Sequence, residues 1–394
     1  MNIFSPGHFP LNRHLIYSGS FLMDFICAFV VGGVAVYALE LGAGPVHLGT
    51  IGATGAGLYV ICSLLAGRLC DKFNRKRSLL VYGLICLAAC AMFTRAASLL
   101  ELYIYYGLFH VSMGFYWPTL QTLLADSSHR RNLSTTLGNF CISWSLGFTL
   151  GHYLCGRLTE YDATLPFGWC VIMSLAVLVL ILLLSEKEAA EKSSGKDFLA
   201  RPGAADIRLW KRFLLCGWIA NFSLVFTLGA AKMLFPKLAL DVDGLDRTTL
   251  GLMLALIHGG QLCMFWLVKY WHGWQYNRRI YLLTQLLAVP GAALLIWTSH
   301  PAGYAAGMLL IGLSAGFTYT SSIYYSTSRP PGSSTHTGFH EAMIGMGILT
   351  GPLAGGLVAD TWNLHSPYAL ALLLIVVALA VQGWLLLRPL KQTD

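Results

Sequence analysis

Charged side chains are scarce in this sequence, and that scarcity limits what the protein can be. Asp, Glu, Lys and Arg together make up 11% of the 394 residues, about half of the usual share in soluble domains. With a mean hydropathy of +0.62, the chain is predicted to turn its outer surface to lipid rather than water. The net charge of +8 then belongs at membrane headgroups, and nucleic acid is not an expected partner.

The sequence also lacks the motifs of an enzyme. It has no G-x-x-x-x-G-K-[ST] nucleotide-binding loop, and no Ser/His/Asp, HExxH or paired-carboxylate set at a useful spacing. Its ten cysteines lie almost all in apolar runs without a CxxC, which is typical of small buried side chains rather than disulfides or metal ligands. We therefore expect no catalytic activity, no cofactor and no metal site.

Twelve apolar segments are long enough to cross a bilayer as helices. The first follows Arg13 and is too long for a signal-peptide core, so we expect it to be retained. If the N-terminus is cytoplasmic, most Lys and Arg side chains fall on the cytoplasmic side, which predicts two cytoplasmic termini in a bacterial inner (plasma) membrane. The predicted segments are 14–38, 47–67, 78–97, 101–125, 134–157, 166–184, 212–235, 248–271, 279–298, 303–325, 335–358 and 366–387.

A polar segment and an internal repeat divide the chain into two halves. Residues 186–208 are polar, of mixed charge and rich in Ser, Gly and Ala, which predicts a cytoplasmic linker without a core of its own. We therefore predict an all-α membrane fold of two pseudo-symmetric six-helix bundles, residues 1–185 and 209–394. The repeat consists of four glycines that return after 200 residues: Gly138, Gly147, Gly151 and Gly156 recur as Gly338, Gly347, Gly351 and Gly356.

The turn after the second segment carries a motif, Gly67-Arg68-Leu69-Cys70-Asp71-Lys72-Phe73-Asn74-Arg75-Lys76-Arg77-Ser78-Leu79. It resembles the G-x-L-x-D-x-x-G-R-K-x-x-L signature of the major facilitator superfamily of secondary transporters. Asn74 replaces the second glycine, and asparagine also reaches the left-handed conformation that a tight turn needs. The resemblance implies a gating loop of Gly67, Asp71, Arg75, Lys76 and Arg77, with Asp71 and Arg75 as the latch. Basic residues that only set the topology are the alternative.

The eleventh segment carries Gly347, Gly351, Pro352 and Gly355, a series that resembles the family's glycine and proline motif for helix five. Small residues let helices pack closely, and proline can bend a helix. In the family this motif is associated with antiporters, but its better copy lies here in the other half. Plain helix packing is an equally good interpretation, so import and export both stay open.

Charged residues inside the apolar segments are the strongest indicators of a site. Each costs about 2.5–3.5 kcal/mol at the centre of a membrane helix, so something must compensate it. The three are Asp24, Lys232 and Glu341. Lys232 lies about 9 Å nearer the outside than Asp24 by helix rise, so we do not expect a direct ion pair between them; outward snorkelling of Lys232 is the alternative to a site.

His110 is predicted to share the depth of Asp24, on one helical face with Tyr106 and Trp117. A carboxylate and an imidazole at one depth could share a proton, because imidazole titrates near neutral pH. A hydrogen-bonded packing histidine is the alternative. Four residues of the second half add polar groups to the predicted cavity: Asn221, His258, Gln261 and Tyr319.

The function that these features predict is secondary transport of a small organic solute by alternating access, coupled to protons. We expect a monomer whose partners are the solute, protons and the lipid bilayer. Passive or sodium-linked transport of sugars or other metabolites is the first alternative. A receptor or enzyme that does not transport, built on the same scaffold, is the second.

Overall fold

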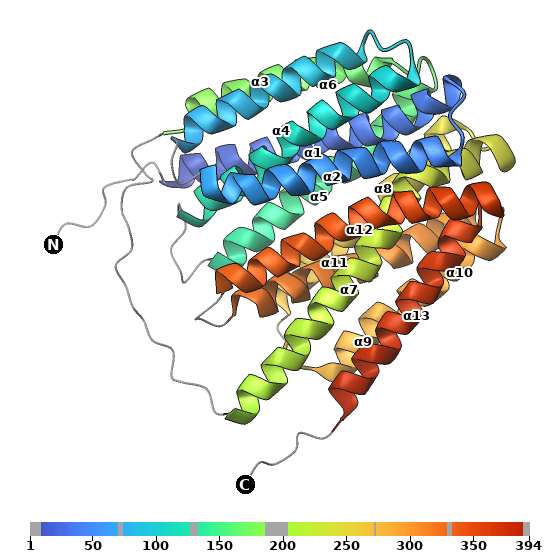
Figure 1. The fold of residues 1–394 in the computed structure, drawn as a ribbon. Helices are drawn as coiled ribbons and strands as arrows, with labels where there is room; N and C mark the ends of the chain where they lie inside the picture. Colours follow the sequence, from blue (N-terminus) through green and yellow to red (C-terminus); the bar gives the residue numbers. More distant parts are fainter. Residues whose placement is uncertain are drawn as a thin grey trace.

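The fold, taken from a computed structural model, is helical throughout the residues that the structure describes, which are 9–69, 74–126, 133–185, 204–271, 273–328 and 333–388. Figure 1 shows the helices lying roughly side by side. They are α1 (Phe9–Glu40), α2 (Pro45–Leu69), α3 (Arg75–Phe93), α4 (Leu99–Asp126), α5 (Leu133–Thr159), α6 (Leu165–Leu183), α7 (Ala204–Lys237), α8 (Arg247–Tyr270), α9 (Arg278–Leu286), α10 (Ala288–Trp297), α11 (Pro301–Thr327), α12 (Ser333–Thr361) and α13 (Ser366–Leu387).

Each predicted apolar segment corresponds to helix in this structure. The ninth is broken at Leu287 into α9 and α10, and Pro290 explains the break because it lacks the N–H that would bond to Leu286. The first turn of α7 begins at Ala204, inside the segment predicted as linker, and residues 186–203 of that linker lie outside the described ranges. A π-helical turn, η3 (Leu238–Val242), extends α7.

The outer faces of the helices carry large apolar side chains. Leu64, Trp169, Ile172 and Leu373 are each about half exposed or more, as are many similar residues. Among the described residues, ten helices are long and apolar enough to span a membrane. A surface of this kind is stable in lipid and not in water, so the chain is an integral membrane protein.

The helices form two sets that meet through two extensive pairs and through lighter contacts of α7 with α1 and α2. In the first set α1 packs on α5 and α6, and α4 on α2 and α3; in the second, α7 packs on α11, α12 and α13. Figure 1 shows the first set in blue to green and the second in yellow-green to red. Extensive contacts between the sets are made by α5 with α8 and by α2 with α12. These two pairs correspond under the repeat, since they join spans five to eight and two to eleven.

Glycines allow these pairs to approach closely. A Cβ on Gly156 would lie 2.7 Å from the Cα of Gly251, and one on Gly49 would lie 3.1 Å from the Cα of Gly356. Both contacts are backbone against backbone, so neither could yield by turning a side chain. The predicted packing residues of α12 divide between two partners. Gly347, Gly351 and Gly355 face α7, whereas Pro352 lies against Gly49 and Gly52 of α2 and Gly229 of α7.

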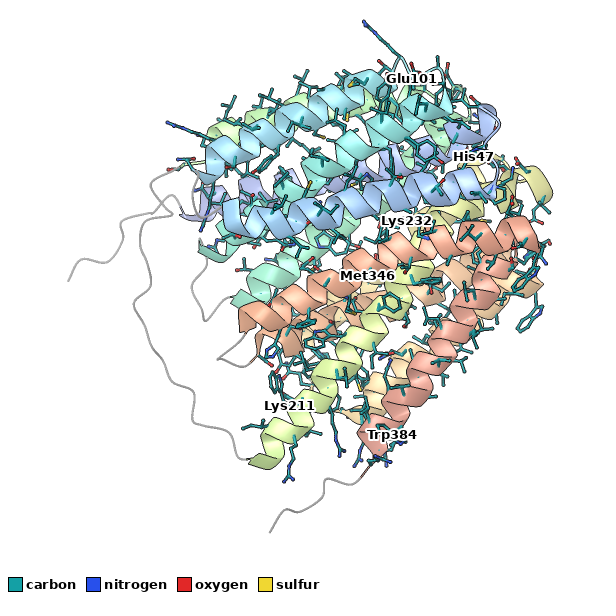
Figure 2. All side chains as sticks on the ribbon, viewed as in Figure 1. His47, Glu101, Lys211, Lys232, Met346 and Trp384 are labelled. Carbon is teal, nitrogen blue, oxygen red and sulfur yellow. The ribbon has the colours of Figure 1, made fainter. Side chains whose placement is uncertain are left out.

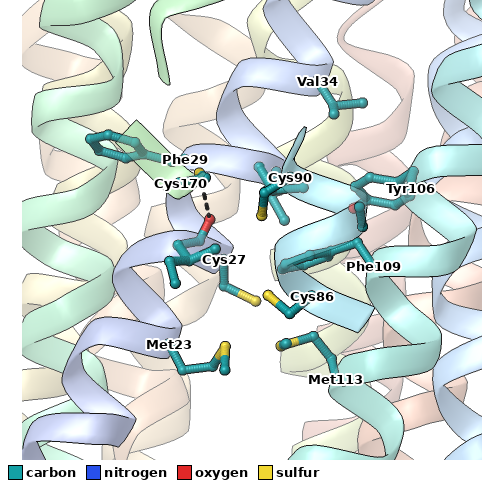
Figure 3. Close-up of a cluster of buried hydrophobic side chains, with 14 of the residues drawn as sticks. Met23, Cys27, Phe29, Val34, Cys86, Cys90, Tyr106, Phe109, Met113 and Cys170 are labelled. Carbon is teal, nitrogen blue, oxygen red and sulfur yellow. Dashed lines mark hydrogen bonds between the residues drawn. The ribbon is translucent and has the colours of Figure 1, made fainter. Parts of the chain in front are cut away.

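The core of the first set is rich in sulfur. Figure 3 shows Cys27, Cys86, Cys90 and Cys170 among Met23, Met113 and aromatic side chains. All four cysteines are free and buried, as predicted for small core residues. Cys263 differs, because it is a free cysteine that is exposed.

Candidate functional site

A cavity with a volume of about 230 Å³ lies between the two sets of helices. Its wall comes from α1, α2, α4 and α5 on one side and from α7, α8, α11 and α12 on the other. These are spans 1, 2, 4 and 5 of one half and the corresponding spans 7, 8, 10 and 11 of the other. The cavity therefore lies on the pseudo-symmetry axis of the molecule.

The structure brings nearly all of the predicted cavity residues together. Asn221 is the exception: it is buried beside His340, with its amide nitrogen 3.5 Å from Nδ1 of that ring, and His340 bonds to Ser322 at 2.8 Å. Asn221 thus belongs to a polar cluster behind the wall, between α7, α11 and α12. The predicted residues that line the cavity are Asp24, Tyr106, His110, Trp117, Lys232, His258, Gln261, Tyr319 and Glu341.

Lys232 and Asp24 face this cavity from opposite halves. Lys232 does not snorkel outward; its Nζ lies 4.9 Å from the centroid of the Phe148 ring. Within the described part of the chain no ion pair joins it to Asp24, as the difference in depth predicts. Lys232 is nevertheless the charged group that acts electrostatically on Asp24. The two side chains therefore line one cavity from opposite halves without a direct bond between them.

The histidines of the site are oriented by local hydrogen bonds. His110 Nδ1 lies 2.9 Å from the carbonyl oxygen of Tyr106, and His152 Nδ1 lies 3.0 Å from that of Phe148. Because a carbonyl only accepts, each neutral ring carries its proton on Nδ1 and keeps a lone pair on Nε2. His110 can thus present an Nε2 acceptor to the cavity.

A stack of three rings continues the wall from α5 to α8. Phe148 lies nearly parallel to His258 with ring centroids 4.3 Å apart, and His258 stacks on His152 at 5.2 Å. Nδ1 of His258 pairs with the Gln261 side-chain oxygen at 2.6 Å. The stack crosses from one half to the other at the level of Lys232.

Sequence reasoning missed most of the aromatic wall. Phe140, Trp144 and Phe148 line the cavity from α5, and His152 follows them at the same spacing of four. A spacing of four residues indicates one face of a helix. The glycines in the same segment indicate helix packing, however, and the sequence does not distinguish a packing face from a cavity face. Tyr59 of α2 and Gln121 of α4 also line the cavity.

The predicted gating loop lies partly outside the described residues, and Asp71 is among those that are not described. Gly67 lies in the last turn of α2, and Arg75 begins α3. Lys76 donates to the carbonyl oxygens of Leu182 and Leu184 at 2.8 and 2.7 Å, so it caps the end of α6. Arg77 is exposed.

The conformation predicted for Asn74 is wrong. Its φ of −62° and ψ of 121° are extended rather than left-handed. Its side chain instead accepts a hydrogen bond from the backbone N–H of Arg77 at 3.1 Å. Asn74 is therefore the N-cap of α3, a position at which asparagine is favoured.

At the opposite end of the molecule the first half holds the start of α8. Arg247 donates to the Glu40 carboxylate at 2.6 Å and to the carbonyl oxygen of Thr159 at 2.7 Å. The Glu160 carboxylate accepts from the backbone N–H groups of Arg247 and Thr248 at 2.9 and 3.2 Å. A carboxylate at a helix N-terminus is favourable because free N–H groups and the helix dipole meet there. We call Glu40, Thr159, Glu160 and Arg247 the outer clamp, after the side of the membrane on which the distribution of basic residues predicts this end.

The fold and the site define a helical membrane protein with a largely aromatic and apolar cavity that holds a few charged side chains, on the axis between two related halves. Residues 16–339 match the family model of the Major Facilitator Superfamily. The chain belongs to this superfamily, and as a member it is a membrane transporter rather than an enzyme. Transporters of this family bind small-molecule substrates within a lipid bilayer.

Known relatives are similar at low identity. The chain is 23% identical over 359 residues to Multidrug resistance protein 1 of Bacillus subtilis (strain 168), covering 87% of this chain and 88% of that protein. It is 25% identical over 222 residues to the quinolone resistance protein NorA of Staphylococcus aureus (strain MRSA252), covering 56% of each.

Solved structures share the fold. The nucleoside transporter NupG superposes with a TM-score of 0.74 at 12% identity, covering 95% of this chain and 98% of that one. A bacterial homologue of the human lysosomal transporter Spinster gives a TM-score of 0.73 at 12% identity, covering 97% and 98%. At these identities the likeness concerns the fold alone.

Proposed function

We propose that this chain is a secondary transporter of a small organic solute, and that it works by alternating access with coupling to protons. The observation that carries the proposal is the central cavity, into which Asp24 projects from one half and Lys232 and Glu341 from the other. Charged side chains at membrane depth are costly and mark solute or proton paths. A site between two related halves is where rocking of the halves would expose it to each side in turn.

Asp24 is the proposed proton carrier. It is 5% exposed and makes no hydrogen bond or ion pair within the described ranges, so its ionised form lacks direct compensation. A proton on Asp24 would remove that charge, and His110, which lines the same cavity, is the group that we propose exchanges the proton. Residues 1–185 and 209–394 are the proposed moving bodies, joined by residues 186–208.

The outer clamp supports closure of one side. Its bonds join the two halves at the end of the molecule opposite to the start of α1 and the end of α13 (Figure 1). With both termini in the cytoplasm, as the distribution of basic residues predicts, this end faces outward. We propose the bacterial plasma membrane as the location and a monomer as the working unit.

Flux in proteoliposomes tests the proposal. The purified chain is reconstituted with a pH-sensitive dye inside, and a panel of small organic solutes is added with and without a pH gradient. We expect at least one solute to move protons, and the sign of the pH change gives the direction of transport. Asp24→Asn should abolish the solute-driven pH change. Asp360→Asn is the matched control, because Asp360 is exposed near the end of α12.

Three results would contradict the proposal. Solute flux that ignores the pH gradient and is unchanged in Asp24→Asn would exclude proton coupling through this residue. Counterflow without any ion dependence would instead identify a passive carrier. Absence of flux for every solute, with a folded protein, would contradict transport itself.

A further inference from the structure

Among the described residues, Lys232 is the lysine or arginine that lines the cavity. Its ammonium N–H groups have no hydrogen-bond acceptor there. An ammonium group has three N–H donors. The described ranges supply Lys232 with no hydrogen bond and no ion pair; its close contact is the face of Phe148 at 4.9 Å. A cation–π contact compensates part of the charge but accepts no conventional hydrogen bond. An oxygen-bearing anion in the cavity would use the free donors.

The counter-charge that the protein does provide comes from the other half. Asp24 of α1 acts electrostatically on Lys232 of α7 without touching it. An ammonium in an apolar wall needs one anion nearby, because an isolated buried charge is costly. Asp24 and an anionic solute are therefore alternatives for the same role. If the anionic solute is the counter-ion of Lys232, a negative charge on Asp24 is no longer required to balance the ammonium. Asp24 can then accept a proton.

The rest of the wall indicates the remainder of the solute. Seven aromatic side chains line the cavity, and these are Tyr59, Tyr106, Trp117, Phe140, Trp144, Phe148 and Tyr319. Aromatic rings favour stacked and edge-to-face contacts with other rings. The cavity volume of about 230 Å³ is below the roughly 300–1,000 Å³ of sites for drug-sized ligands. One or two rings fit such a space.

We propose that the cavity binds a small aromatic organic anion, whose acidic group pairs with Lys232 while Asp24 takes up a proton. This inference rests on the proposed function of the cavity and specifies its solute. The proton comes from the water on the side to which the cavity is open and bonds to a carboxylate oxygen of Asp24. Net charge in the site is then the same before and after binding: the anion of Asp24 is replaced by the anion of the solute.

Other titratable groups face the same space and could take the proton instead. Tyrosines and a thiol contribute Tyr59 of α2, Tyr106 of α4, Tyr319 of α11 and Cys27 of α1. The remaining groups are His110 of α4, His258 of α8 with His152 of α5 stacked behind it, and Glu341 of α12. Cys27 and Asp24, both of α1, are the two groups that act electrostatically on Lys232. Asp24 is singled out because a carboxyl group ordinarily ionises well below neutral pH, whereas a thiol ordinarily stays protonated there.

Co-binding of a proton and an anion has a thermodynamic signature. Binding of each must strengthen binding of the other, because coupling between two sites is reciprocal. The dissociation constant of the anion should therefore fall as the pH is lowered, by up to about tenfold per pH unit for one proton taken up. Transport would then carry both in the same direction.

Calorimetry on the full-length protein in detergent or nanodiscs tests the inference without any need for flux. The probes are benzoate, 3-phenylpropionate and 2-naphthoate, each compared with the primary alcohol and the primary amine of the same ring. Titrations at pH 6 and pH 8, in buffers of different ionisation enthalpy, give the affinity and the number of protons taken up. We expect an acid to bind at least about tenfold more tightly than its alcohol, with close to one proton taken up.

Variants assign the two roles. Lys232→Gln should remove the preference for the acid over the alcohol, whereas Lys232→Arg should keep it. Asp24→Asn should bind the acid tightly at both pH values without proton uptake. Lys211→Gln is the control on the same helix, because Lys211 is exposed and Figure 2 shows it far along α7 from Lys232.

The inference is overturned if no acid of the panel binds better than its alcohol, if the amine binds best, or if proton uptake persists in Asp24→Asn. Thermal melting of each variant checks that it is folded, and if Lys232→Gln does not fold, the wild-type proton count and Asp24→Asn still decide. These failures leave the proposed function intact if proteoliposomes still couple another solute to protons. Loss of all coupled flux would instead remove the proposed function.

Discussion

At the scale of single residues, the cost of placing a charge in lipid made the centre of the site visible in the sequence. Asp24, Lys232 and Glu341 interrupt apolar segments, and all three line the cavity. Lys232 could not be assigned from its position alone, because a lysine near a helix end can also reach headgroups. The fold decides this point by turning its side chain toward Phe148.

Aromatic residues gave no comparable signal. Trp144 and Phe148 lie in an apolar segment where aromatic side chains cost nothing, so packing and solute binding leave the same pattern. Asn221 shows the opposite error: it is polar and buried, but its partner is His340 rather than the cavity. A polar side chain within a membrane helix is expected to have a hydrogen-bond partner. The sequence does not show whether that partner is another helix or a solute in the cavity.

Asp246 offers a test of the structure outside the membrane. It is the N-cap of α8, and its carboxylate accepts from the backbone N–H and the hydroxyl of Thr249 at 2.7 and 2.6 Å. These two bonds lower the pKa of the Asp246 carboxyl. Asp246→Ala should destabilise the protein by about 1 kcal/mol, seen as a lower melting temperature at pH 7.

The pH dependence of this effect has a definite sign. Because the pKa of Asp246 is lower in the folded protein, the contribution of its charge is present above the unfolded pKa of about 3.9 and is lost as the pH falls through the folded pKa. Asp246→Asn keeps a good capping residue without the charge. The melting temperature of this variant should lack that acid-dependent loss, and an equal loss in both proteins would argue against the cap.

At the scale of helices, length and hydropathy predicted twelve segments, and the structure has helix at each, although only ten of the described helices are long and apolar enough to span a membrane. Breaks within them were less predictable. Pro290 divides the ninth span, although proline is tolerated in other helices here, such as Pro118 in α4 and Pro352 in α12. Whether a proline breaks a helix depends on how neighbouring groups satisfy the freed carbonyl, and that depends on the tertiary structure.

The glycine repeat was visible in the sequence, but its partners were not. Gly156 meets Gly251 across the two halves, whereas Gly347 and Gly351 meet Phe226 within one half. Corresponding glycines make corresponding contacts: Gly147 and Gly151 face α1 as Gly347 and Gly351 face α7, and Gly356 meets Gly49 across the halves as Gly156 meets Gly251. A repeat shows that two helices have related roles, and only the packing shows which surface each glycine faces.

The contact between α5 and α8 predicts the effect of a single methyl group. Gly156→Ala would place Cβ 2.7 Å from the Cα of Gly251, so the two backbones must move apart. We expect a lower melting temperature, because overpacking costs about 1–3 kcal/mol. Gly338→Ala is the matched control: a Cβ there meets nothing within 4 Å, and alanine is the better helix former. Equal effects of the two substitutions on melting would contradict the close approach.

At the scale of the whole molecule, the arrangement of two halves around one cavity explains two features together. Charged residues make up only 11% of the chain, and a few of them are nevertheless buried within the helices. The surface that faces lipid is apolar, whereas the charged residues Asp24, Lys232 and Glu341 within the spans line the cavity on the axis. Figure 2 shows Lys232 between the two sets of helices, while Lys211 and Trp384 lie near the end where α7 begins and α13 ends. The family fold followed from topology, duplication and one motif, but the identity of the solute did not, because it depends on side chains that meet only in three dimensions.

The central claim is that the two halves move about the cavity so that it opens at one end while it closes at the other. Distances between spin labels measure this motion directly. One pair, at His47 of α2 and Asp360 of α12, reports the end held by the outer clamp. A second pair, at Leu64 of α2 and Gly338 of α12, reports the opposite end. All four positions are exposed.

Arg247→Gln removes the charged bond to Glu40 and so should weaken the clamp. We predict that the His47–Asp360 distance lengthens in this variant while the Leu64–Gly338 distance shortens, relative to the protein with Arg247 intact. Distances that stay unchanged at both ends, or that lengthen together, would contradict alternating access about this cavity.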